Sequence, residues 1–172
     1  MRYQITYYSP CGYAKLLADA FYEALPYDTY VSNLEKKTLP WADIQLIGFE
    51  LNGINLEMIP FKVIEYLEIL DKKKILLFVT VPFQYNDSIK GRIEKYILPF
   101  LSDNCDYLGM YLCSAQPSQT LVDDVKKIIE QQPDNENINY WLELCQSASG
   151  HPDREDIQNG CEFIKNILTL EE

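Results

Sequence analysis

The first 25 residues constrain the fold most strongly, because their hydrophobic pattern changes period across one short turn. Residues Tyr3–Tyr8 are rich in β-branched and aromatic side chains, which is typical of a strand. From Ala14 onward apolar side chains recur at helical spacing, at Leu17, Ala20, Phe21, Ala24 and Leu25. A helix that begins so soon after a strand has unpaired N–H groups at its positive end. The turn between them is therefore predicted to be able to bind a phosphate.

The rest of the chain alternates between segments typical of strands and segments typical of helices. Further strands are predicted at 27–34, 43–49, 75–81 and 107–113, and helices from Pro60, at 89–100, 121–129 and 138–145, and from Asp153. This alternation predicts a single α/β domain over residues 1–172, a three-layer sandwich around a five-stranded parallel sheet. The expected strand order is 2-1-3-4-5, with the most hydrophobic run, 75–81, as the central strand.

Local signals set several boundaries. Residues 50–59 are predicted to be a loop, because they contain the turn pair Asn52-Gly53. Pro60 can open a helix, since its missing N–H is not needed there. Asp153 is predicted to cap the last helix, with Asp156 assisting as in a capping box.

Composition limits the possible partners. The chain of 172 residues has a formal net charge of −11 and is 47% hydrophobic. Nucleic acid and anionic membranes are therefore not expected as partners, because both select basic surfaces. A basic protein partner fits this charge, although the acidity could also serve solubility alone. Five cysteines without a C-x-x-C pair indicate neither a disulfide framework nor a zinc site. The absence of a long apolar run or an apolar leader predicts a cytoplasmic protein.

Three segments resemble flavodoxins. The turn Ser9-Pro10-Cys11-Gly12-Tyr13-Ala14 resembles the flavodoxin phosphate loop [ST]-x-T-G-N-T; Ser9 and Gly12 match it, while Cys11, Tyr13 and Ala14 depart from it. Residues 111–117 resemble the fifth-strand loop of the family. Residues 150–157 resemble the G-H-P-x-x-x-D-[LI] entry to the last helix in a short flavodoxin-like group. The resemblance implies a flavodoxin-like fold, FMN as the cofactor and electron transfer as the function.

In a sheet of this order ligands bind beyond the carboxyl ends of the strands, where the loops after strands 1, 3 and 4 are expected to meet. The first loop would offer N–H groups to the phosphate. The second would offer a flexible peptide that could move with the redox state of the flavin, and the third would offer aromatic rings for stacking. The predicted cofactor-binding residues are Ser9, Pro10, Cys11, Gly12, Tyr13, Ala14, Asn52, Gly53, Pro82, Phe83, Gln84 and Tyr85.

The function predicted from the sequence is that of an FMN-binding electron carrier with a redox partner protein. FMN is expected rather than FAD or nicotinamide dinucleotides, because the loop matches a single-phosphate site and the chain lacks G-x-G-x-x-G. No residue near the site stands out as a proton donor, which favours a carrier over a stand-alone enzyme. Two alternatives remain open: a flavodoxin-like binding module that has lost FMN, and a small FMN-dependent reductase.

A thiol-based alternative is also considered. Cys11-Gly12-Tyr13-Ala14 resembles the C-G-[FY]-[SA] site of monothiol glutaredoxins, and Thr80-Val81-Pro82 resembles their T-V-P. A cysteine at a helix N-terminus is expected to have a lowered pKa, as a thiolate nucleophile requires. The glutaredoxin fold, however, is smaller and does not contain five parallel strands.

Overall fold

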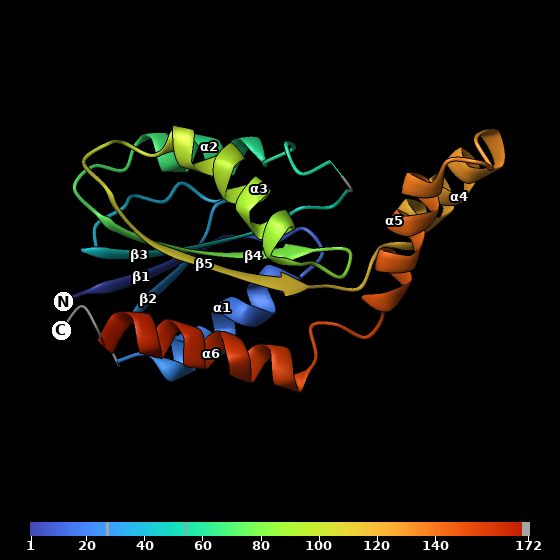
Figure 1. The fold of residues 1–172 in the computed structure, drawn as a ribbon. Helices are drawn as coiled ribbons and strands as arrows, with labels where there is room; N and C mark the ends of the chain where they lie inside the picture. The colour runs from blue at the N-terminus through green and yellow to red at the C-terminus, as the bar shows by residue number, and fades with distance from the viewer. Residues whose placement is uncertain (27, 54, 170–172) are drawn as a thin grey trace.

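The fold is built on a parallel sheet of five strands in the order β2-β1-β3-β4-β5 (Figure 1). The structure is a computed structural model, and it describes residues 1–26, 28–53 and 55–169. The strands are β1 (Tyr3–Tyr8), β2 (Tyr30–Asn33), β3 (Ile44–Glu50), β4 (Lys74–Val81) and β5 (Asp106–Ser114). The parallel α/β architecture and the strand order predicted from the sequence are confirmed.

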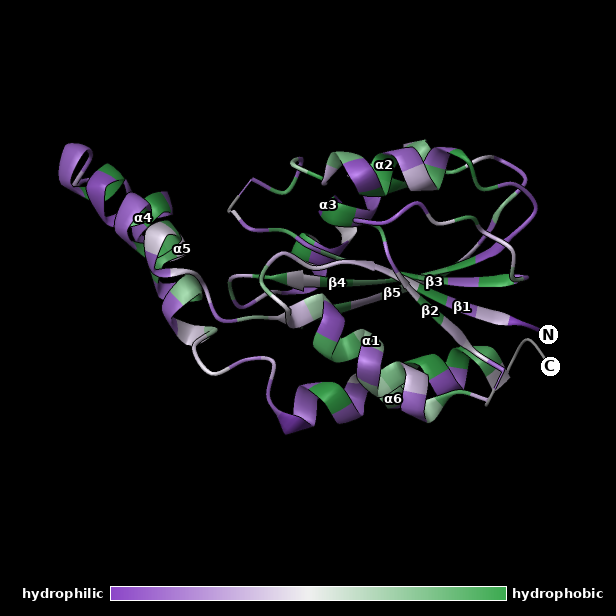
Figure 2. Ribbon diagram, turned by 180° about the vertical axis from the view of Figure 1, so that it is seen from behind, coloured by the Kyte–Doolittle hydropathy of each residue, from purple (hydrophilic) through white to green (hydrophobic). Residues whose placement is uncertain are grey.

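Helices cover both faces of this sheet. On one face lie α1 (Tyr13–Ala24) and α6 (Arg154–Thr169), and on the other lie α2 (Phe61–Glu68) and α3 (Asp87–Ile97) (Figures 1 and 2). A 3₁₀ turn, η1 (Leu98–Phe100), follows α3 and contains Pro99. The predicted three-layer sandwich is therefore confirmed.

Two further helices stand away from the sheet. Helices α4 (Gln119–Gln131) and α5 (Glu136–Ser147) pack on each other and project beyond the carboxyl end of β5 (Figure 1). We call residues 119–147 the arm. Its tip is hydrophilic, as Figure 2 shows, and its base is attached to the loop after β4. The chain returns from the arm to α6, which packs beside α1.

The run 75–81 lies in β4, an interior strand between β3 and β5, which confirms its predicted central place in the sheet. One sequence prediction about the strands is wrong in detail. Glu50, predicted to lie in a loop, is the last residue of β3, paired with Thr80 in register. Tyr27 and Ile54, which the predicted second strand and the predicted loop include, lie outside the described residues.

Close packing between the sheet and α1 fixes the position of that helix against the sheet. A Cβ added at Gly48 would lie 2.0 Å from an atom of the Phe78 ring, so glycine makes the space that this ring fills. Phe78 in turn packs edge-on against Phe21 of α1, with the ring centroids 5.1 Å apart. Buried aromatic pairs of this kind stabilise a helix position by dispersion and by ring electrostatics. This contact holds α1 against the sheet.

Within the described part of the chain, no helix has the length and the apolar character needed to cross a membrane.

Candidate functional site

The turn before α1 has the backbone geometry of an anion-binding loop. Gly12, the N-cap residue, has φ = +93°, a left-handed conformation that costs glycine little and other residues more. This conformation lets the chain reverse from strand to helix within a few residues. The N–H groups of Cys11, Tyr13 and Ala14 then point toward one position at the positive end of the helix.

A carboxylate of the same chain occupies that position. Glu50 Oε1 accepts hydrogen bonds from Tyr13 N at 2.7 Å, from Ala14 N at 3.1 Å and from the Ser9 hydroxyl at 2.5 Å. Glu50 Oε2 accepts a bond from Cys11 N at 2.7 Å. Ser9 Oγ also accepts a bond from Lys15 N at 2.9 Å. The donors of the loop therefore converge on one anionic group, and that group is the side chain of Glu50.

The alternation of side chains along β3 explains why Glu50 reaches the loop. Ile44 and Leu46 belong to the core cluster on the α1 side, whereas Ile47 and Phe49 belong to the cluster on the α2 side. Glu50 has the parity of Ile44 and Leu46, so its side chain leaves the sheet toward α1. Only 2% of the residue is exposed, and a carboxylate so deeply buried needs several charge-assisted hydrogen bonds.

The sequence analysis missed Glu50 because it placed the residue in a loop. Extending the predicted third strand by one residue would have identified it. An acidic residue that ends an otherwise apolar strand, on the side of the sheet that the first helix covers, lies next to the loop after β1. The site residues then lie together at the carboxyl edge of the sheet, where the parallel strands end.

A small pocket lies beside the loop, where the segments after β1, β3, β4 and β5 converge. Its volume is about 30 Å³, enough for one or two water molecules. Four predicted site residues line it: Cys11, Tyr13, Asn52 and Pro82. Its other lining residues were not predicted: Leu51, Thr80, Val81, Ala115, Gln116 and Ser118. The three predicted loops thus meet as expected, and the loop after β5 joins them.

Two of the residues expected in the loop after β4 contact the arm instead. Phe83 is fully buried, and its ring packs edge-on against Trp141 of α5 with centroids 4.9 Å apart. Gln84 N donates to the carbonyl oxygen of Leu144 at 2.9 Å, and Gln84 Nε2 donates to that of Ser147 at 3.3 Å. Tyr85 remains 38% exposed, and it does not line the pocket.

Cys11 does not have the electrostatics of a thiol nucleophile. Burial, and then the neighbouring Glu50 carboxylate, raise the pKa of the Cys11 thiol above its ordinary value. The lowered pKa expected from the helix N-terminus is therefore wrong, because Glu50 neutralises the positive end of α1. The thiol donates weakly to Asn52 Oδ1 at 3.6 Å. The remaining predicted residues, Pro10 and Gly53, lie on the two loops without lining the pocket.

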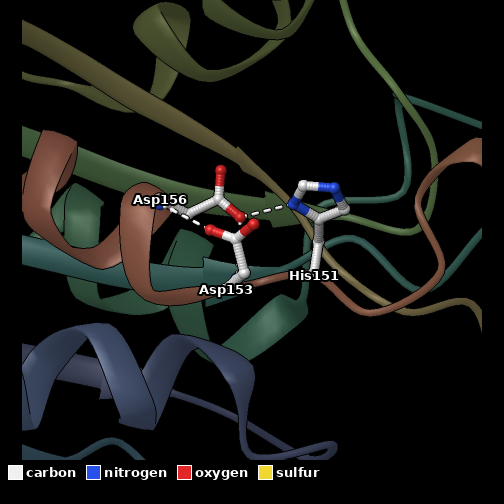
Figure 3. A group of neighbouring side chains, drawn as sticks. All are labelled: His151, Asp153 and Asp156. Atoms are coloured by element: carbon white, nitrogen blue, oxygen red, sulfur yellow. Dashed lines mark hydrogen bonds and ion pairs between the residues drawn. The ribbon is translucent and has the colours of Figure 1, made fainter.

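His151, Asp153 and Asp156 form a compact polar group at the start of α6 (Figure 3). Asp153 N donates to Asp156 Oδ2 at 2.8 Å, and Asp156 N donates to Asp153 Oδ1 at 3.0 Å. This reciprocal pair confirms the predicted capping box. His151 Nδ1 lies 2.5 Å from Asp156 Oδ2, a contact that raises the pKa of the histidine. The hydrogen bonds of the cluster thus have a structural role at the helix entry.

A parallel sheet of this order, with an anion-binding turn after its first strand, defines a doubly wound α/β protein of the nucleotide-binding class. A family model described as a flavodoxin domain matches residues 4–165. The chain therefore belongs to the flavodoxin family, as its sequence motifs suggested.

Individual proteins are also similar to this chain. The flavodoxin-like domain-containing protein BilS of Clostridioides difficile (strain CD3) is 28% identical over 104 residues, which are 60% of this chain and 59% of that protein. The match thus spans about three-fifths of the length of the curated relative. A short-chain flavodoxin associated with a non-canonical PDU bacterial microcompartment superposes with a TM-score of 0.53 at 12% identity, covering 87% of this chain and 99% of that one. That similarity concerns the fold. A Streptococcus pneumonia TIGR4 flavodoxin covers 86% of this chain and 99% of its own, at 15% identity and a TM-score of 0.49.

Members of the flavodoxin family bind FMN, and FMN is the cofactor that the family assigns to this chain. The donors around Glu50 suit the phosphate of FMN, because they are backbone N–H groups and a hydroxyl directed at one anion. When bound, FMN supplies the redox chemistry, and the protein supplies the site and its electrostatics.

Proposed function

We propose that this protein is an FMN-binding electron carrier that delivers electrons to a separate reductase. The observation that carries the proposal is the loop at the start of α1, whose N–H groups converge on one anion. The loop lies at the edge of the sheet between β1 and β3, where the chain connections to β2 and β4 leave in opposite directions. This is the position at which α/β proteins of this order bind nucleotides.

The twelve predicted residues take different parts in this proposal. Residues 9–14 would hold the phosphate through backbone N–H groups and the Ser9 hydroxyl. Asn52-Gly53 and Pro82 would border the flavin ring, and Tyr85 would stack on it. Phe83 and Gln84 would act indirectly, by attaching the loop after β4 to the arm. The protein itself supplies no acid or base in this scheme.

Charge indicates the kind of partner. The arm rises from the same edge of the sheet and carries six acidic and two basic residues, in a chain of net charge −11. An acidic surface beside the flavin would attract a partner with a basic docking face and would disfavour the reduced, anionic flavin. The motif at the last helix is similar to that of the flavodoxin-like partner of bacterial bilirubin reductase, so a reductase of that kind is our candidate acceptor. The five free cysteines suit a reducing compartment, and we place the protein in the cytoplasm.

Cofactor titration tests the first half of the proposal. The purified protein, freed of ligand, is titrated with FMN, FAD and NADH while flavin fluorescence and the visible spectrum are followed. We expect saturable binding of FMN in preference to the two dinucleotides. Binding of FAD without FMN contradicts the proposal, and so does the absence of all flavin binding.

Steady-state assays test the second half. The FMN-loaded protein alone should reduce acceptors negligibly with NADH or NADPH. It should turn over only when one enzyme passes electrons from NAD(P)H to the flavin and the acceptor reductase is also present. The rates should fall with added salt, because charge steering is screened over about 8 Å at physiological ionic strength. Rapid turnover by the isolated protein would identify it as an enzyme instead.

A second function, that of a binding module that has lost FMN, is favoured by two observations. Glu50 already holds the four donors of the loop, and the neighbouring pocket has a volume of about 30 Å³, much smaller than a flavin ring needs. The cofactor titration separates the two functions directly.

A further inference from the structure

We propose that Glu50 is an internal ligand of the phosphate loop, which competes with the phosphate of FMN and sets the affinity of this protein for its cofactor. The inference rests on the proposed function, and it adds a residue that determines how tightly the phosphate of the cofactor is bound. It follows from the carboxylate that receives three backbone N–H groups and the Ser9 hydroxyl at the start of α1.

One loop cannot hold both anions. The four donors that a phosphate would use are all directed at the two oxygens of Glu50, at distances of 2.5 to 3.1 Å. A phosphate within the same distances would lie against a carboxylate of the same sign in a site removed from water, where repulsion is strong. Binding of FMN through its phosphate therefore requires that the carboxylate leave the loop.

The position of Glu50 in the chain permits this movement. It is the last residue of β3, and the following residue keeps the ladder closed, because Leu51 N donates to the Thr80 carbonyl at 2.9 Å. Rotation of the Glu50 side chain can move the carboxylate without breaking that backbone contact. The N–H groups then exchange one anion for another and remain paired in both states.

Competition of this kind acts on the phosphate and not on the ring. Riboflavin, which has the same ring and no phosphate, can bind while Glu50 stays in the loop. The wild-type protein should therefore bind FMN no more than about tenfold more tightly than riboflavin. A loop free of an internal ligand would give a much larger preference, because a phosphate held by several charge-assisted bonds contributes strongly to binding.

The test compares Glu50→Gln and Glu50→Ala with the wild type, and uses Glu57→Gln as the matched control. Glu57 lies in the loop after β3 and loses the same charge, but it has no contact with residues 9–14 among its described partners. FMN, riboflavin and inorganic phosphate are titrated in phosphate-free buffer. Binding is followed by calorimetry and by the amide NMR signals of Tyr13 and Ala14.

We expect both Glu50 variants to bind FMN at least about tenfold more tightly, about 1.4 kcal/mol, with riboflavin affinity unchanged. Inorganic phosphate should shift the Tyr13 and Ala14 amide signals of Glu50→Ala at concentrations that leave the wild type and Glu57→Gln unaffected. The NMR spectrum of each variant shows whether it is folded. The ratio of the FMN and riboflavin affinities is measured on the wild type, so that part of the test does not depend on any variant.

Several outcomes overturn the inference. Equal or weaker FMN binding by both Glu50 variants would show that the carboxylate does not compete. A large preference of the wild type for FMN over riboflavin would show the same. If no protein binds any flavin, the proposed function fails, and the phosphate titration still decides the role of Glu50: unshifted amides in Glu50→Ala would exclude it.

Discussion

Replacement of Ser9 by alanine tests whether the buried carboxylate organises the loop. The Ser9 hydroxyl donates to Glu50 Oε1 at 2.5 Å and accepts from Lys15 N at 2.9 Å. A hydrogen bond to a charged group contributes about 1.5–3 kcal/mol to stability, whereas the exposed bond to Lys15 N contributes about 0.5 kcal/mol, since water can replace the hydroxyl. We expect Ser9→Ala to lower the free energy of unfolding of the ligand-free protein by about 2–3 kcal/mol. The melting temperature should then fall by roughly 5–10 °C for a chain of this size.

A double-mutant cycle isolates the contact between Ser9 and the carboxylate. In the Glu50→Gln background the acceptor is neutral, so Ser9→Ala should cost only about 1 kcal/mol. The coupling energy is then about 1–2 kcal/mol. All four proteins are unfolded with urea in phosphate-free buffer without flavin, because a bound ligand would add its own stabilisation.

Ser118→Ala is the control for this cycle. Ser118 caps α4 by accepting a bond from Leu121 N at 3.1 Å, and it has no described contact with Glu50. Its loss should cost about 1 kcal/mol in either background. Coupling between Ser9 and Glu50 below about 0.5 kcal/mol, the range expected of independent sites, would refute the geometry described for the loop.

Three further predictions concern Cys11, Tyr66 and His151. Glu50→Gln should lower the raised pKa of Cys11 and speed alkylation of that residue at pH 7.5, as measured by peptide mapping; an unchanged rate would contradict the role of the carboxylate. Tyr66→Phe should lower the free energy of unfolding by about 1–2 kcal/mol in urea, because Gln45 Oε1 loses the buried donor that lies 2.9 Å away. The raised pKa of His151 means that its contact with Asp156 stabilises the fold below the unfolded-state pKa of about 6.5, and that this contribution is lost as pH rises through the higher folded-state pKa. Urea titrations between pH 5.5 and 8.5 should show this slope in the wild type and a flatter profile in Asp156→Asn.

Much of the fold could be predicted from the sequence because its signals are local and periodic. The change from strand to helix after Tyr8 was visible in the spacing of apolar residues, and the capping pair Asp153 and Asp156 was visible as a short motif. Ile157, Cys161, Ile164 and Leu168 recur at helical spacing, and all four lie in or against the core cluster on the α1 side. Each of these patterns can be recognised within a single helix, strand or turn, without knowledge of its neighbours in the fold.

The contents of the site depend on contacts between distant segments, which periodicity does not encode. Glu50 and the loop at residues 9–14 are about 40 positions apart in the chain, and their contact depends on which residue ends β3. An extension of that strand by one residue changes an exposed loop acid into a buried ligand. Phe83 was similarly predicted to stack on the flavin, and the arm that covers it could not be placed from the sequence of α5 alone.

At both ends of the candidate cofactor site, a loop is bound to another part of the same chain. The phosphate loop holds Glu50, and the loop after β4 holds the arm through Gln84 and the Phe83–Trp141 contact. When a ligand binds only to protein whose internal competitor has left the site, its apparent affinity equals its intrinsic affinity multiplied by the fraction of protein in that open state. If Glu50 occupied the loop in about 99% of the cofactor-free molecules, FMN would bind about 100-fold more weakly than the open loop allows. The distinction between a carrier and a module that has lost FMN is therefore one of degree, and the free energy with which the loop holds Glu50 decides it. A carrier requires the flavin ring and phosphate together to outweigh the carboxylate, which the comparison of FMN with riboflavin measures directly.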